Sequence, residues 1–175
     1  MRLSPGLVAA IAMILLGCDS EQEPTWTEPG AYIAQFTART QPIDARDGQT
    51  LYVPVYSNIL VGEGARPTEM AATLAIRNTD REHEIFVTSV RYYDTAGQLL
   101  ETYLEGAYGL GPMASASIFI NVSDTRGGMG ANFLVEWAAE TGVSDPVVET
   151  IMVGASGTKG FSFTSPARVL AETGG

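Results

Sequence analysis

The chain has 175 residues, enough for one domain of ordinary size and a tail, and its 45% hydrophobic content argues against disorder throughout. The formal net charge is −10 and Lys159 is the only lysine, so the chain lacks the basic stripe that binding to nucleic-acid phosphates requires. The single cysteine, Cys18, cannot form an internal disulfide.

Residues 1–17 have the pattern of a signal peptide. Arg2 supplies a positive start, and residues 7–16 are an unbroken apolar run that is too short to span a bilayer. Leu15-Leu16-Gly17-Cys18 then resembles the lipobox of bacterial lipoproteins, in which a small residue lets the signal peptidase reach the bond before a cysteine that takes the lipid. We therefore expect cleavage between Gly17 and Cys18 and lipidation of Cys18. The simpler alternative is a secretory signal with an incidental cysteine.

Residues 18–47 are predicted to be a polar tether between the lipid and the domain. Residues 19–30 are acidic, carry Pro24 and Pro29, and show no periodicity. A first strand near residues 31–37 is left open.

Residues 48–169 show short apolar segments with period two, separated by turn residues. The predicted strands are residues 50–57, 71–80, 84–94, 98–104, 113–122, 131–139, 147–154 and 161–165. Pro54 cannot donate a ladder hydrogen bond, so its strand is expected at a sheet edge or at a bulge. Residues 94–97, with Gly97 at the end, predict a hairpin turn. The pattern indicates an all-β fold, an antiparallel β-sandwich of about seven to eight strands, followed by a tail at residues 170–175.

The middle of the chain resembles immunoglobulin-like domains of exported bacterial proteins. The features are an asparagine turn after residues 71–77, a "DTAG" hairpin and a Leu110-x-Pro112 turn leading into a strand. Several segments, "LYVPVYSNI", "MAATLAIRNTD", "YYDTAGQLL", "GANFLVEW" and "SGTKGFSFTSPARV", together resemble an uncharacterised bacterial family known as domain of unknown function 3124. This resemblance implies an exported or lipid-anchored protein without an established activity. It also implies that relatives commonly carry histidine at the position of Asn58, which argues against a catalytic or metal-binding role for that position here.

Two long loops are candidate binding segments. Residues 57–70 mix apolar residues with glycines, Asn58 and Arg66, and form either a partner-binding loop or a flap that folds Ile59 and Val61 onto the sandwich. Residues 123–132 place three glycines beside Asp124, Arg126 and Asn132. This loop either lets backbone N–H groups approach an anion or is a turn that needs φ > 0 repeatedly.

Catalytic and metal-binding patterns are weak. His83 is the only histidine and lies between Glu82 and Glu84 in a charged turn, where a surface role is the simpler interpretation. Asp80, Asp124, Glu136 and Asp145 do not have a calcium-loop spacing, so no metal site and no cofactor are predicted.

The sequence therefore predicts a protein that is lipid-anchored in the bacterial cell envelope, at the inner or the outer membrane, with its domain in the periplasm or outside. Its expected role is non-enzymatic: binding of an envelope protein partner or assembly of the envelope. The alternative is a periplasmic domain that binds a small ligand or metal through residues 123–132. Nucleic acid is not an expected partner.

Overall fold

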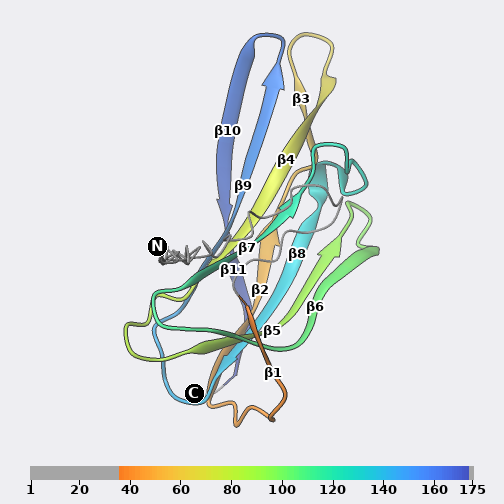
Figure 1. Cartoon of the computed structure of the whole chain (residues 1–175). Coiled ribbons are helices and arrows are strands. Elements are labelled where there is room, and N and C mark those ends of the chain that lie inside the picture. The colour runs from red at the N-terminus through yellow and green to blue at the C-terminus, as the bar shows by residue number, and fades with distance from the viewer. Residues whose placement is uncertain (1–35, 174–175) are drawn as a thin grey trace, which may run out of the picture.

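The computed structural model describes residues 36–173, so Gly17, Cys18 and most of the predicted tether lie outside the described residues. Within residues 36–173 the chain forms two antiparallel sheets that pack face to face (Figure 1). No helix in this part of the chain is long and apolar enough to cross a membrane. The prediction of an all-β antiparallel sandwich is confirmed.

Eleven strands build the two sheets, more than the seven or eight that were predicted. The first sheet has the order β1 (Thr37–Arg39), β6 (Leu99–Leu110), β5 (Ile85–Tyr93), β8 (Asn132–Ala139), β2 (Asp47–Pro54) and β11 (Arg168–Thr173). The second sheet has the order β10 (Lys159–Pro166), β9 (Val147–Ser156), β4 (Arg66–Arg77) and β3 (Asn58–Val61). β7 (Ser115–Ile120) also pairs with β4, next to residues 72–77.

The core lies between the sheets and follows from alternation along the strands. In β8, Phe133, Val135 and Trp137 point inward and are at most 3% exposed, while the residues between them lie partly outside. The second sheet supplies the facing layer, which includes Met70, Leu74, Ile76, Ile118 and Met152.

The central strands pair as in an immunoglobulin-like domain, but an early strand and a late strand each join the opposite sheet. β4 pairs with β7, and β5 pairs with both β6 and β8. In an immunoglobulin domain the first strand joins the sheet of the second strand, and the last strand joins the other sheet. Here the early strand β2 pairs with β8, whereas the late strand β9 pairs with β4.

The strand containing Pro54 was predicted to lie at a sheet edge or to carry a bulge. The edge alternative was wrong, because β2 lies between β8 and β11. The pairing of β2 with β11 does shift register, opposite Thr50 and Leu51. Val55 N donates to Ala131 O (3.0 Å), so the N–H that Pro54 lacks would point toward the β11 side. Pairing with β11 ends at Tyr52, and the missing donor therefore leaves no ladder bond unmade.

Residues 57–70 were predicted to be a loop, but most of them form a β-hairpin. β3 pairs with β4 from Asn58↔Glu69 to Val61↔Arg66, and Gly62 and Gly64 have φ of +71° and +89° in the turn. β9 and β10 form a second hairpin. The two hairpins extend beyond the other strands (Figure 1), and we refer to residues 58–70 and 153–162 as the hairpin arm.

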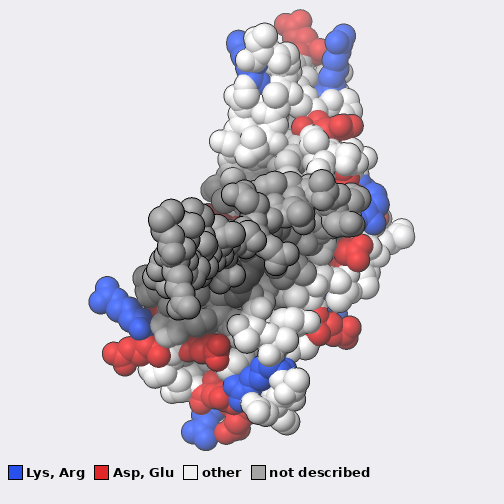
Figure 2. Space-filling model, viewed as in Figure 1, with Lys and Arg blue, Asp and Glu red and all other residues white. Residues whose placement is uncertain are grey.

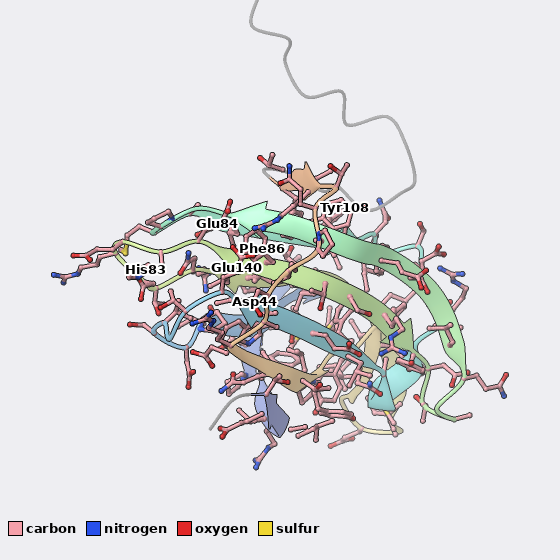
Figure 3. The ribbon with its side chains drawn as sticks, turned by 90° about the horizontal axis from the view of Figure 1, so that it is seen from below. Asp44, His83, Glu84, Phe86, Tyr108 and Glu140 are labelled. Atoms are coloured by element: carbon pink, nitrogen blue, oxygen red, sulfur yellow. The ribbon has the colours of Figure 1, made fainter. Side chains whose placement is uncertain are left out.

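Strands of the first sheet form close to both ends of the described chain. β11 occupies residues for which a tail from residue 170 onward was predicted, and β1 begins at the end of the stretch 31–37. Residues 40–46, which we call the strap, run from β1 to β2. Asp44 of the strap lies beside Glu140 (Figure 3), and its N–H donates to Glu140 Oε1 (3.3 Å). Arg39 holds the start of the strap, because its guanidinium lies 2.7 Å from Glu140 and 4.5 Å from the centre of the Phe86 ring.

Candidate functional site

The glycine-rich loop between β7 and β8 is held by hydroxyl side chains from two other segments. The loop contains a short 3₁₀ helix, η1 (Gly128–Gly130). Gly128 N donates to Ser57 Oγ (2.7 Å), and Gly130 N donates to Thr95 Oγ1 (2.9 Å). Ser57 N and Thr95 N donate in return to the carbonyls of Gly128 and Gly127 (both 3.0 Å). The N–H groups of Gly128 and Gly130 are therefore already bound within the protein.

Close packing explains two of the glycines. A Cβ at Gly127 would lie 1.9 Å from Tyr92 Oη, and a Cβ at Gly128 would lie 2.7 Å from Thr95 Oγ1. Gly128 also has a φ of +75°, which favours glycine. Of the two interpretations of this loop, the geometry favours a tightly packed turn over an anion cradle.

Asp124 and Arg126 form a bidentate pair with each other. Arg126 Nε and Nη2 donate to the two carboxylate oxygens at 2.9 and 2.8 Å, and the second nitrogen lies 4.0 Å from Glu101. The hydrogen bond from the Arg126 side chain holds the pKa of Asp124 below its usual value. A guanidinium with a carboxylate partner on two nitrogens has less to offer an anionic ligand.

Tyrosine rings lie beside this pair. The rings of Tyr92 and Phe133 have centroids 5.2 Å apart, and Tyr103 lies 6.1 Å from Phe133. Burial, followed by the charge of Asp124, raises the pKa of Tyr103 to about 12. The Tyr92 hydroxyl is buried and has no hydrogen-bond partner among the described residues. Burial also raises the pKa of Tyr92, so both phenols are neutral at physiological pH.

The other candidate residues from the sequence are spread over different elements. Asn132 begins β8 at the end of the glycine-rich loop, opposite Tyr93. Asn58 follows Ser57 and pairs with Glu69. Arg66 lies next to the turn of the hairpin arm. Of the predicted set, Asp124 and Arg126 bond to each other, whereas Asn58 and Asn132 lie at segments that adjoin the loop. The sequence alone did not point to Ser57, Thr95 or Glu101, because their contacts join distant segments.

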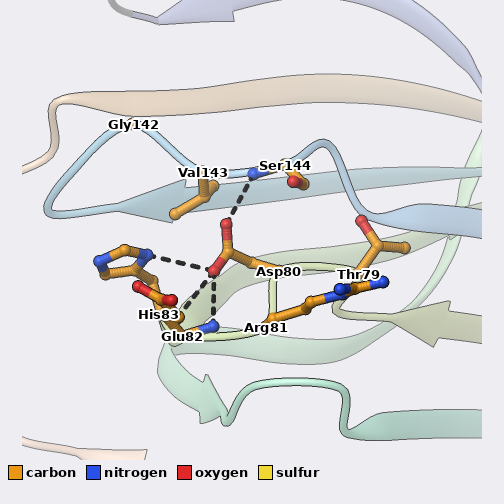
Figure 4. Close-up of a pocket in the computed structure, with 8 residues that line it drawn as sticks. All are labelled: Thr79, Asp80, Arg81, Glu82, His83, Gly142, Val143 and Ser144. Atoms are coloured by element: carbon orange, nitrogen blue, oxygen red, sulfur yellow. Dashed lines mark hydrogen bonds and ion pairs between the residues drawn. The ribbon is translucent and has the colours of Figure 1, made fainter.

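A shallow hollow of about 510 Å³ lies around the turn between β4 and β5 (Figure 4). Its floor is organised by Asp80, whose carboxylate accepts backbone N–H groups from Glu82 (2.9 Å), His83 (2.8 Å) and Ser144 (3.0 Å). These bonds, of which that from the Glu82 N–H has the largest effect, hold the pKa of Asp80 well below its usual value. The carboxylate therefore joins the β4–β5 turn to the β8–β9 loop.

His83 contacts the same carboxylate, with Nδ1 3.1 Å from Asp80 Oδ1. The ring is exposed and comes from the same turn, and Asp80 is its only hydrogen-bond partner among residues 36–173. A nucleophile–histidine–acid triad would need a hydroxyl on the other ring nitrogen. The pair therefore stabilises the turn.

Three of the four acidic residues considered as metal ligands, Asp80, Asp124 and Glu136, have other partners. Glu136 pairs with Arg91 across two strands of the first sheet, and Asp124 pairs with Arg126. Among the described residues, no group of three or more histidine, cysteine, aspartate or glutamate side chains is arranged to hold a metal ion.

The outer face of the second sheet exposes uncharged residues along its central rows. Pairing places Ala71 beside Val153, and places Thr73 between Ile151 and Phe119. Val153 is 54% exposed and Phe119 is 40% exposed. The described part of the arm is largely uncharged below its tip (Figure 2). We call this surface the outer patch; it consists of Ala71, Thr73, Phe119, Ile151, Val153, Ser162 and Thr164.

Charges border the outer patch at its two ends. Glu69, within the hairpin arm, lies at one end, and Arg77 forms a 2.6 Å ion pair with Glu149 at the opposite end. The strand ranges predicted from the sequence do not show that these residues share one surface.

These features define a single antiparallel β-sandwich with an extended hairpin arm. The chain belongs to the family described as "Protein of unknown function (DUF3124)", whose model matches residues 48–170. The family resemblance seen in the sequence is thereby confirmed. No curated protein and no solved structure matched the chain.

Proposed function

We propose that this protein is a lipid-anchored envelope protein whose sandwich domain is a non-enzymatic binding or envelope-assembly module. The lipobox-like Leu15-Leu16-Gly17-Cys18 supports the anchor. The observation that carries the binding role is the outer patch, where Phe119 and Val153 are exposed on an uncharged sheet surface. Exposed apolar residues gathered on one surface mark interaction sites in soluble domains.

The chemistry of the outer patch indicates the kind of partner. A flat face of small, uncharged and apolar side chains pairs best with another apolar protein surface, since it offers no charge to a nucleic acid or an ion. The bordering pair Arg77–Glu149 neutralises itself. The partner is therefore a protein with a flat, weakly charged contact surface.

A cross-linked pull-down of the full chain from its own envelope tests the binding role. Val153→Lys places a charge in the outer patch and should reduce recovery of the partner at least about tenfold. Val169→Lys is the matched control, since Val169 is 49% exposed but lies on β11 of the first sheet. Equal recovery with both variants would rule out the outer patch as the binding surface.

The anchor is tested separately. Intact-mass analysis of the purified protein should find a lipid on an N-terminal Cys18, and Cys18→Ala should abolish that modification. An unmodified Cys18 in protein extracted from the membrane would refute lipid anchoring and leave the binding test unaffected.

A further inference from the structure

We propose that β10 is a dimerisation edge, which pairs antiparallel with β10 of a second copy of this chain around a two-fold axis at Ser162. This inference goes beyond the proposed function, because it concerns the free backbone groups of a strand edge and a second copy of the chain. Ser162 and Thr164 belong both to this edge and to the outer patch. β10 is the first strand of its sheet and pairs only with β9 in the described part of the chain (Figure 1).

The hairpin turn determines which backbone groups of β10 are free. Ser156 pairs with Lys159 across a two-residue turn, in which Gly157 has a φ of +62°. The residues that flank such a turn form a hydrogen-bonded pair, and these pairs recur at every second residue. Lys159, Phe161 and Phe163 therefore bond to β9, whereas Gly160, Ser162 and Thr164 direct their N–H and C=O groups away from it.

The pairing of β10 with β9 is regular and the strand is uncharged beyond its first residue. Eight consecutive pairs run from Lys159↔Ser156 to Pro166↔Glu149 without a register shift, and residues 160–166 carry no charge. Proteins commonly protect exposed edges with short strands, bulges or charges. In the first sheet, β1 has three residues, and β11 has a register shift after Val169 and carries Arg168 and Glu172.

The edges of the second sheet differ in how well their inward side chains are covered. In β7, Ala116, Ile118 and Ile120 are at most 4% exposed. In β10, the inward residues Phe161 and Phe163 are only partly buried. Unlike β7, β10 therefore leaves apolar area at its edge that a further strand would cover.

The two aromatic rings of β10 are held in place within the monomer. Gly154 leaves space for the Phe161 ring, since a Cβ there would lie 2.7 Å from that ring and 2.9 Å from Met70. Phe163 packs edge-to-face on Tyr56, with ring centroids 5.7 Å apart. Neither ring has to be reordered when a further strand is added.

A two-fold axis at Ser162 matches all of these features. Ser162 then faces Ser162 of the second copy, and Gly160 faces its Thr164, which joins the free backbone groups in hydrogen-bonded pairs. Phe161 faces Phe163 of the second copy on the inner side, as a close cross-strand aromatic pair. The chain carries a net charge of −10, so an uncharged edge is a place where two copies meet without strong repulsion.

The test is sedimentation equilibrium of the purified full chain in density-matched detergent, with Ser162→Lys as the main variant. Two lysines would face each other at the axis, so the dissociation constant of the dimer should rise at least about tenfold. Ser115→Lys is the matched control on the edge strand β7 and should leave association unchanged. Thr164→Pro removes an N–H that is free in the monomer and should also weaken the dimer.

Two results would overturn the proposal. One is a parent chain that stays monomeric up to about 100 µM. The other is equal association of the Ser162→Lys and Ser115→Lys variants. Hydrogen exchange identifies other occupants of the edge: slow exchange at residues 160, 162 and 164 in a monomer would mean that a different segment covers β10. Phe119→Lys changes the outer patch on β7, which pairs with β4 and lies away from β10. It should weaken partner binding and keep the dimer, so failure of partner binding and failure of dimerisation remain distinguishable.

Discussion

Gly127 lies where a side chain has no room. Its position is set by Tyr92, whose hydroxyl would lie 1.9 Å from an added Cβ, and by Ala131, whose Cβ would lie 2.8 Å away. The φ of Gly127 is −68°, so packing rather than backbone conformation requires glycine here. This distinguishes Gly127 from the neighbouring Gly128, which has a positive φ.

Gly127→Ala should therefore destabilise the fold by about 1–3 kcal/mol, because the buried Tyr92 ring must shift to accept the methyl group. Gly142→Ala is the control, since nothing lies within 4 Å of its added Cβ and its φ is not positive. The control should change the free energy of unfolding by less than about 1 kcal/mol. Urea denaturation of both variants measures the difference, and equal midpoints would contradict this account of the loop.

The raised pKa of Tyr103 predicts how the free energy of unfolding changes at alkaline pH. Burial raises its pKa in the folded protein to about 12, from 10.0 for a free tyrosine. The unfolded chain therefore ionises first, so this contribution to stability is fully present below pH 10 and is lost as the pH rises toward 12. Tyr103→Phe should flatten the fall in stability across that interval. Thermal unfolding between these pH values is the measurement, and unchanged slopes would refute the prediction.

At the scale of elements, the turn between β4 and β5 is fixed from two sides. Asn78 is 2% exposed, and its amide nitrogen donates to the carbonyls of His83 (2.8 Å) and Leu110 (3.0 Å). Asp80 joins the same turn to the β8–β9 loop through Ser144. One buried amide and one carboxylate thus position three connections at this end of the sandwich.

Asp80→Ala should lower Tm at neutral pH, because three backbone N–H groups lose their charged acceptor. The folded pKa of Asp80 lies below its usual value of 3.8, so its contribution is present above that pH and is lost as the pH falls below it. The difference in Tm between parent and variant should therefore shrink in acid. Asp44→Ala, at an exposed surface pair, is the control and should change Tm little at any pH.

Strand alternation in the sequence predicted the elements that bury one face. β8 and β7 were recognisable because Phe133, Val135 and Ile118 alternate with exposed neighbours. β11 was not, since all six of its residues are exposed and leave no alternation to detect. β3 was missed because residues 59–61 are consecutive apolar residues in a four-residue strand. The strand order of the sheets depends on pairings between distant segments, which local pattern does not encode.

The candidate site was predictable only where its contacts are local. Asp124 and Arg126 are two residues apart, and the sequence already placed them in one loop. The partners that hold this loop, Ser57 and Thr95, lie 71 and 35 residues from the atoms they bind. Asn58 and Arg66 were grouped with the glycine-rich loop because of their residue types. The structure instead places Arg66 next to the turn of the β3–β4 hairpin.

For the whole molecule, the two sheets present different outer surfaces. The first sheet has ion pairs across its strands, Arg91 with Glu136 and Arg39 with Glu140. The outer patch of the second sheet has none along its central rows. A charged outer surface is stable in contact with water, whereas an exposed apolar surface is stabilised when another protein surface covers it. This asymmetry is consistent with one sheet facing water and the other facing a partner.

The weak attachment of β1 and the strap determines how the domain responds to a pulling force. β1 pairs with β6 over three residues and Arg39 adds one ion pair, whereas β2 pairs over eight residues with β8. Tension applied from the N-terminal side would therefore peel β1 and the strap away before β2 and the sandwich yield. Residues 36–46 would release up to about 40 Å of chain in this way. A pulling experiment should show this extension as an early, low-force step, and Arg39→Ala should lower the force further. With the proposed lipid on Cys18, the domain would absorb small movements of that anchor without unfolding.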